Sequence, residues 1–161
     1  MRIEITPPPD LDLRFLEAEV KRALEATMKG AAMLVANDAK QRIARGAKSG
    51  RIYTTRFATN KSTGGIFPTE ARVPHQASAP GEAPATDTGK LISSIVADAQ
   101  GTKAWVEARS AYAVHLEYGT RRMQARPFMM PAFEAQRARI GDLIRGAVTT
   151  AMTRFAEKAQ R

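Results

Sequence analysis

Apolar residues recur at steps of three and four near the start of the chain and again at its end. This spacing gathers apolar side chains into a stripe on one side of a helix. In the first segment we expect a helix from a cap at Asp10 to about Arg45, where Gly46 ends it. The second segment predicts a C-terminal helix. The stripes comprise Leu13, Leu16, Val20, Leu24, Met28, Ala31, Leu34 and Val35, then Phe133, Ile140, Ile144, Val148, Met152 and Phe155.

Between these helices the apolar positions alternate with polar ones, which is the spacing of β-strands. The clearest case is 95–109, where Gly101 and Thr102 turn the chain between two alternating runs and predict a β-hairpin. Trp105 shares a face with charged residues, so we expect it to lie against a helix or, alternatively, in an intersubunit contact. A second alternating run opens residues 51–75, which we interpret as an extended basic β-hairpin or arm. Its return strand is expected at 66–73, and a disordered surface loop is the alternative.

Proline distinguishes the remaining segments. Residues 1–10 contain three consecutive prolines, which lock the backbone and predict an extended lead-in. Residues 76–86 contain Pro80 and Pro84 among small residues and predict an irregular Pro-rich loop. The pattern as a whole predicts a single domain over 1–161 of the α+β class, with long N-terminal and C-terminal helices packed on a small, mainly antiparallel β-sheet.

Two short motifs stand out from this pattern. The first is AYAVHLEYGTRRMQARPFMMP at 111–131, in which Gly119 ends an aromatic-bearing helical turn and Pro127 suits the first turn of the next helix. Between them lies a loop with three arginines, which looks built for contact with a partner. The second motif is a Pro-Gly loop at 78–85 that leads into Thr-Gly-x-Leu-x-x-Ser, where Asp87 or Thr86 is expected to cap a short helix.

Together the two motifs resemble the tail-completion and head-tail-joining proteins of long-tailed phages, over residues 78–133. The resemblance implies an α+β fold and a homo-oligomeric ring in the neck of the virion, assembled in the host cytoplasm. Such a ring completes the tail and joins it to the head connector. Its partners would be tail tube and head-connector or stopper proteins, with genomic double-stranded DNA passing through the lumen.

The resemblance also implies a set of residues at a subunit or partner interface. Glu117 and Arg126 are expected to form a structural ion pair, within or between subunits. The full set is Asp87, Thr88, Gly89, Leu91, Tyr112, Glu117, Tyr118, Gly119, Thr120, Arg121, Arg122, Arg126, Pro127 and Phe128.

The formal net charge of +9 lies in two regions, because 40–75 carries +7, 121–161 carries +6, and the other two segments are each −2. Clustered Lys and Arg suit a polyanion such as DNA. The basic residues of the arm, Arg51, Arg56, Lys61 and Arg72, are therefore candidates to face DNA or a lumen. An acidic neighbouring subunit is the alternative partner. The alternative function is a basic DNA-binding module without sequence specificity, acting as a monomer or dimer.

Catalytic and metal-binding patterns are not found in the sequence. The chain has no cysteine and only two histidines, His75 and His115. Glu117 lies two residues from His115, a spacing that does not bring both to one helix face. Residues 81–90 have the wrong spacing for a phosphate-binding loop. We therefore expect neither an enzyme nor a metal or cofactor site, and no window is apolar enough to predict a membrane span.

Overall fold

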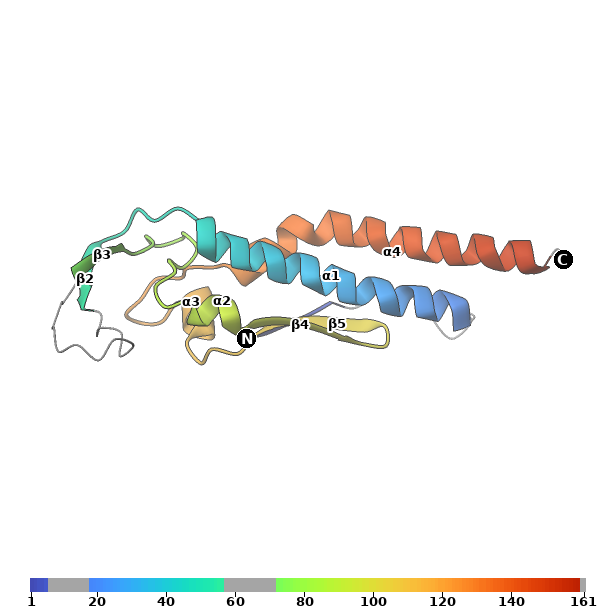
Figure 1. The fold of residues 1–161 in the computed structure, drawn as a ribbon, viewed down its shortest axis with the longest axis horizontal. Helices are drawn as coiled ribbons and strands as arrows, with labels where there is room; N and C mark the ends of the chain where they lie inside the picture. Colours follow the sequence, from blue (N-terminus) through green and yellow to red (C-terminus); the bar gives the residue numbers. More distant parts are fainter. Residues whose placement is uncertain (6–17, 57–71, 160–161) are drawn as a thin grey trace, which may run out of the picture.

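The computed structural model describes residues 1–5, 18–56 and 72–159 and confirms the α+β class (Figure 1). A three-stranded antiparallel sheet has the order β1-β5-β4, and β2 and β3 form a separate two-stranded sheet. The predicted helix end at Gly46 is confirmed. In chain order the elements are β1 (Arg2–Ile5), α1 (Ala18–Arg45), β2 (Ile52–Arg56), β3 (Arg72–Gln76), α2 (Lys90–Ser94), β4 (Ile95–Gln100), β5 (Lys103–Ala108), α3 (Ala113–Tyr118) and α4 (Met129–Ala159).

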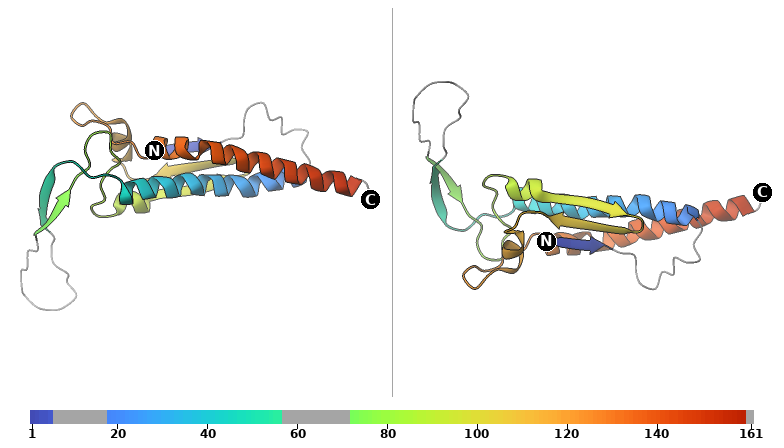
Figure 2. Two further views of the ribbon diagram at one scale, coloured as in Figure 1. Left: turned by 90° about the horizontal axis from the view of Figure 1, so that it is seen from above. Right: turned by 90° about the horizontal axis from the view of Figure 1, so that it is seen from below.

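Helix α1 packs against the three-stranded sheet on one side and against α4 on another (Figures 1 and 2). Its buried positions are rich in alanine, with Ala31, Ala32 and Ala39 fully covered. Small side chains let the neighbouring backbones approach closely, so α1 can pack against both the sheet and α4. Asp38 adds a polar link, because it accepts hydrogen bonds from Arg42 on α1 at 2.6 Å and from Gln136 on α4 at 2.7 Å.

The β4–β5 hairpin forms as predicted, with Gln100 paired to Lys103 across the turn. Alternate residues Ala104, Val106 and Ala108 are buried on the face toward α1. Trp105 points to the other face, and the Arg2 guanidinium lies 4.0 Å from its ring centroid. The expectation that Trp105 lies against a helix is therefore wrong. β1 pairs with β5 inside the segment predicted only as an extended lead-in, while residues 6–10 of that segment lie outside the described residues.

The β2–β3 hairpin lies beyond the end of α1 (Figure 2). Its strands pair from Ile52 with Gln76 to Arg56 with Arg72. The described return strand is thus 72–76, and the expected strand at 66–73 lies outside the described residues apart from its last two positions. Beyond the expected end of the return strand at Val73, β3 continues to Gln76 and contains Pro74 opposite Thr54. A two-stranded sheet consists only of edges, and edges tolerate a residue that cannot donate a hydrogen bond.

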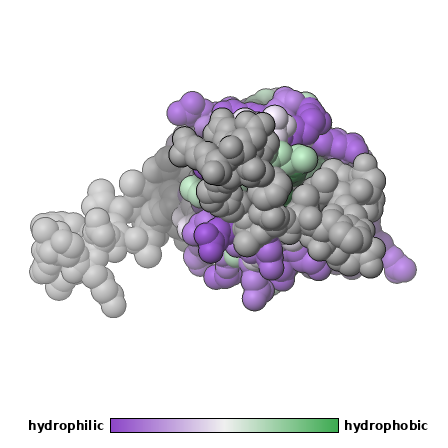
Figure 3. Space-filling model, turned by 90° about the vertical axis from the view of Figure 1, so that its right-hand side faces the viewer, coloured by the Kyte–Doolittle hydropathy of each residue, from purple (hydrophilic) through white to green (hydrophobic). Residues whose placement is uncertain are grey.

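Seen from the end at which α1 begins and α4 ends, the described surface is mainly hydrophilic, with small hydrophobic areas between (Figure 3). Large apolar side chains with high exposure occur at the other end, on β2 and α3, and singly along the helices. On α1 the exposed one is Met33, at 49 %. Its neighbour Met28 is fully buried.

These two methionines provide a matched test of the helix packing. Met28→Ala should lower the free energy of unfolding by about 2–5 kcal/mol, because it leaves a cavity between α1 and its neighbours. Met33→Ala should change it by less than about 0.5 kcal/mol, since its side chain is half exposed. Both values come from urea unfolding followed by circular dichroism. Equal losses for the two variants would contradict this packing.

Candidate functional site

The carboxylate of Glu117 joins α3 to the start of α4. Its oxygens accept hydrogen bonds from the backbone N–H groups of Phe128 at 2.9 Å, Met129 at 3.0 Å and Met130 at 2.8 Å. These are donors that a helix cannot satisfy internally in its first turn, and the next residue, Pro131, has no N–H. The side chain is buried, with the residue only 3 % exposed. Glu117 is thus a complete cap for the positive end of α4.

Two expectations are corrected at this junction. The predicted ion pair between Glu117 and Arg126 is wrong within the chain, because Glu117 binds backbone donors and Arg126 donates from Nε to the Ser78 carbonyl at 3.2 Å. The placement of Pro127 in the first helical turn is also wrong, since α4 begins at Met129. The fully buried side chain of Phe128 lies at the helix start.

The basic loop begins with a tight turn that depends on glycine. Gly119 has φ +76°, and a Cβ on it would lie 2.7 Å from the Met123 carbonyl oxygen. Thr120 donates its N–H to that same carbonyl at 2.7 Å, which closes the turn. Arg121 and Arg122 form its exposed tip. Both arginines are therefore held on a fixed turn and face solvent.

The base of this loop is tied to α3 and to the Pro-rich loop. Arg126 donates its N–H to the Leu116 carbonyl at 2.6 Å, and Gly81 donates to the Ala125 carbonyl at 2.9 Å. Together with the Arg126–Ser78 contact, these bonds bring the two sequence motifs together. The two motifs therefore meet in space, although Ser78 and Arg126 lie far apart in sequence.

The Pro-rich loop is held in turn against the segment after α1. Glu82 accepts hydrogen bonds from the hydroxyl and the N–H of Ser49 and from the N–H of Ala79. These bonds, chiefly the one from the Ser49 hydroxyl, lower the pKa of Glu82 below its ordinary value. Gly50 donates to the Ala77 carbonyl at 2.9 Å, and a Cβ on it would lie 2.5 Å from the Ser78 oxygen. Only glycine fits this approach.

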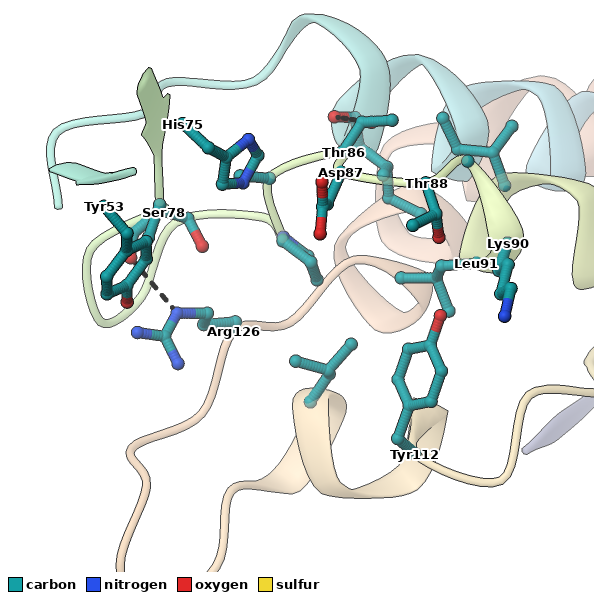
Figure 4. A pocket seen from close by; sticks show the side chains of 17 residues that line it. Tyr53, His75, Ser78, Thr86, Asp87, Thr88, Lys90, Leu91, Tyr112 and Arg126 are labelled. Atoms are coloured by element: carbon teal, nitrogen blue, oxygen red, sulfur yellow. Dashed lines mark hydrogen bonds between the residues drawn. The ribbon is translucent and has the colours of Figure 1, made fainter. Parts of the chain in front are cut away.

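These ties enclose a groove with a volume of about 330 Å³ (Figure 4). The lining comes from the end of α1, the β2–β3 hairpin, the Pro-rich loop, α2, α3 and the base of the basic loop. Its apolar lining includes Leu91 and Ile43, both buried. The polar and aromatic lining residues include Tyr53, His75, Thr86, Asp87, Thr88, Lys90, Tyr112 and Arg126.

The groove brings together six of the residues expected at an interface. They are Asp87, Thr88, Gly89, Leu91, Tyr112 and Arg126. Tyr118 is 66 % exposed outside the groove, and Thr120, Arg121 and Arg122 lie on the exposed turn. Glu117, Gly119, Pro127 and Phe128 shape the junction behind it. Neither Asp87 nor Thr86 caps α2, because Gly89 takes the N-cap position with φ +73° and no side-chain bond.

The predicted basic arm is only partly within the described residues. Arg51 is exposed immediately before β2, and Arg56 and Arg72 lie opposite each other at the last described pair of the hairpin. Lys61 lies outside the described residues. Tyr53 and His75, which pair across the same hairpin, line the groove and were not predicted as site residues. The alternation at 51–57 indicates the strand of Tyr53 but not what it faces, and the return strand expected at 66–73 ends before His75.

Ser78, His75 and Asp87 all line the groove, so serine chemistry has to be considered. No hydrogen bond joins any two of these three side chains, although all lie within the described residues. Activation of a serine requires a hydroxyl bonded to a base and a base bonded to an orienting acid. This arrangement is not in place. The groove is equipped for binding through aromatic, apolar and cationic contacts.

Glu117 supports a prediction about stability. Glu117→Ala should lower the free energy of unfolding by about 2–4 kcal/mol, because three backbone donors lose their buried acceptor. Glu117→Gln should cost less, since its amide oxygen still accepts. Glu134→Ala, an exposed acid in the first turns of the same helix, is the control and should change stability by under about 0.5 kcal/mol. Denaturant unfolding compares the three, and a loss for Glu117→Ala no larger than for the control contradicts the cap.

Glu82 supports a prediction about pH. A lowered pKa in the folded state means that its contribution to stability is present above the unfolded value of 4.5 and is lost as pH falls through the folded value. The amide proton shifts of Ser49 and Ala79 should therefore titrate together with a midpoint below 4.5. Two-dimensional NMR between pH 7 and 3 measures this. Glu82→Gln should abolish the titration, and a midpoint at or above 4.5 would show that the bonds to the carboxylate are not formed.

Two further features of the described residues bear on metal ions and membranes. Within residues 1–5, 18–56 and 72–159, no three acidic or histidine side chains are grouped closely enough to hold a metal ion. In the same ranges no helix has the length and apolar character needed to cross a membrane.

Comparison of the chain with protein-family models, with curated proteins and with solved structures finds no match.

Proposed function

We propose that this chain is a structural protein of the neck of a phage or phage-like particle. It would form a homo-oligomeric ring that completes the tail and joins it to the head connector, with double-stranded DNA passing through the lumen. The observation that carries the proposal is the convergence of the two motifs on one groove. The parts that resemble such proteins contribute residues 87–91 from one motif and Tyr112, Leu116 and Arg126 from the other to its lining.

The composition of this surface suits protein association. Tyr53, Tyr112 and Tyr118 are 47 %, 44 % and 66 % exposed, and they are all the tyrosines of the chain. Arg121 and Arg122 are exposed on the turn that follows Tyr118. Tyrosine and arginine are enriched at the energetic centres of protein interfaces. A ring subunit needs such a surface for its neighbours and for tail or connector proteins.

The hairpin supplies a second supporting feature. Register places Arg56 opposite Arg72 at the last described pair, and Arg51 is exposed at the other end of the strand. In the proposed ring this basic arm faces genomic DNA or an acidic neighbour. In the virion such contacts would be independent of DNA sequence, because arginine and lysine bind phosphates whatever the bases are. No catalytic step is assigned to the protein.

The basic residues of the arm also favour one alternative function. A basic module that binds DNA without sequence specificity, as a monomer or dimer, would use the hairpin in the same way. The two functions differ in what the protein assembles with.

The proposal predicts a ring in solution or a subunit that assembles on particles. Light scattering and native mass spectrometry measure the oligomer, and co-sedimentation with purified tail tubes or capsids measures docking. DNA binding is measured in the same samples at several salt concentrations, where affinity should fall linearly on a log–log scale. A persistent monomer or dimer that ignores particles and binds free DNA tightly would overturn the neck function and support the alternative.

A further inference from the structure

The groove has the character of a site for an acidic, apolar peptide segment. Its floor includes the buried side chains of Leu91 and Ile43. Its rim carries the exposed Lys90 and the half-buried Arg126, and Asp87 is the one acid among the described lining residues. Figure 4 shows Lys90 beside Tyr112 on one side of the groove, with Arg126 beside Tyr53 on another. An occupant should combine apolar side chains for the floor with carboxylates for the rim.

The chain itself contains a segment of this composition. Residues 10–17 read Asp-Leu-Asp-Leu-Arg-Phe-Leu-Glu, which gives four apolar residues and three acids against one arginine. They lie outside the described residues, directly before α1. Their net charge is opposite to that of the groove rim, and their leucines and phenylalanine suit its floor.

Geometry prevents this segment from reaching the groove of its own chain. Helix α1 has 28 residues, and at about 1.5 Å per residue Ala18 lies roughly 38 Å from Ile43, which lines the groove. An extended chain spans at most about 3.5 Å per residue, so Asp10, eight residues before Ala18, reaches no more than about 28 Å. This limit on reach does not apply to the groove of a second copy, because that groove can lie close to residues 10–17.

We propose that residues 10–17 of one copy bind in the groove of the next copy. The contact joins the end at which α1 starts to the end at which α1 stops, so it uses two different surfaces. A head-to-tail contact of this kind repeats, and it generates a ring when the rotation closes and an open filament when it does not. The inference rests on the proposed ring and identifies the surfaces that would hold it together.

A charge swap tests the pairing in the full chain. Lys90→Glu should weaken association about five- to tenfold, because it places a carboxylate on the rim facing the acidic segment. Lys29→Glu makes the same change of charge on an exposed part of α1 and should alter association less than twofold. Asp12→Lys combined with Lys90→Glu should recover most of the loss. Equal weakening by both single variants, or no recovery in the double variant, overturns the pairing.

A crosslinking experiment identifies the occupant directly. A photoreactive benzoyl-phenylalanine replaces Tyr112, or replaces Met33 on α1 as the control, and isotopically light and heavy full-length chains are mixed before irradiation. Position 112 should give mixed-isotope peptides that join it to residues 10–17, and position 33 should give none. A ring that shows no such crosslink overturns this inference and leaves the neck function standing. Crosslinks in a filament that ignores particles support the pairing and overturn the neck function.

Discussion

The carboxylate of Glu117 is the contact on which the candidate site depends. It takes the three backbone donors at the start of α4, and Pro131 supplies no fourth donor. A carboxylate that receives several N–H bonds inside the protein needs no cationic partner. Because Glu117 lies on α3, this one side chain sets where α4 begins relative to α3. The loop between them then has both ends fixed.

The groove follows from that fixed loop. With Gly119 turning the chain at one end and Phe128 buried at the other, the arginine of the Ala-Arg-Pro-Phe motif is directed at the Ser78 carbonyl. The Pro-rich loop is thereby held between Arg126 on one side and Ser49 and Gly50 on the other. Prolines lower the number of conformations such a loop must lose on folding. A few hydrogen bonds therefore suffice to shape a groove from segments with little regular structure.

The sequence predicts elements well where the pattern is local. The alternation at 95–108 and the Gly101 turn specify the β4–β5 hairpin, since both strands and the turn lie in one short stretch. Prediction fails where the decisive partner is distant. The charged neighbours of Trp105 do not indicate which face of the sheet α1 covers, so the expectation that Trp105 lies against a helix is wrong, and the intersubunit alternative stays a prediction. An acid and an arginine in one motif suggest an ion pair. The actual partners of Glu117 are backbone N–H groups at the start of α4, and these are left without a helical acceptor only because α4 begins there. The groove residues Tyr53 and His75 are brought to the site by tertiary packing alone.

The proposed contact also depends on a difference between the two ends of α1. The hairpin, the groove and the arginine turn lie at the end where α1 stops, and the acidic segment 10–17 precedes Ala18 in the sequence. Helix α1, about 42 Å long, separates Ala18 from the groove. In the proposed contact, residues 10–17 of one copy meet the groove of the next, so unlike charges are neutralised at every contact. On that proposal, the length of α1 favours directional assembly over a symmetric dimer.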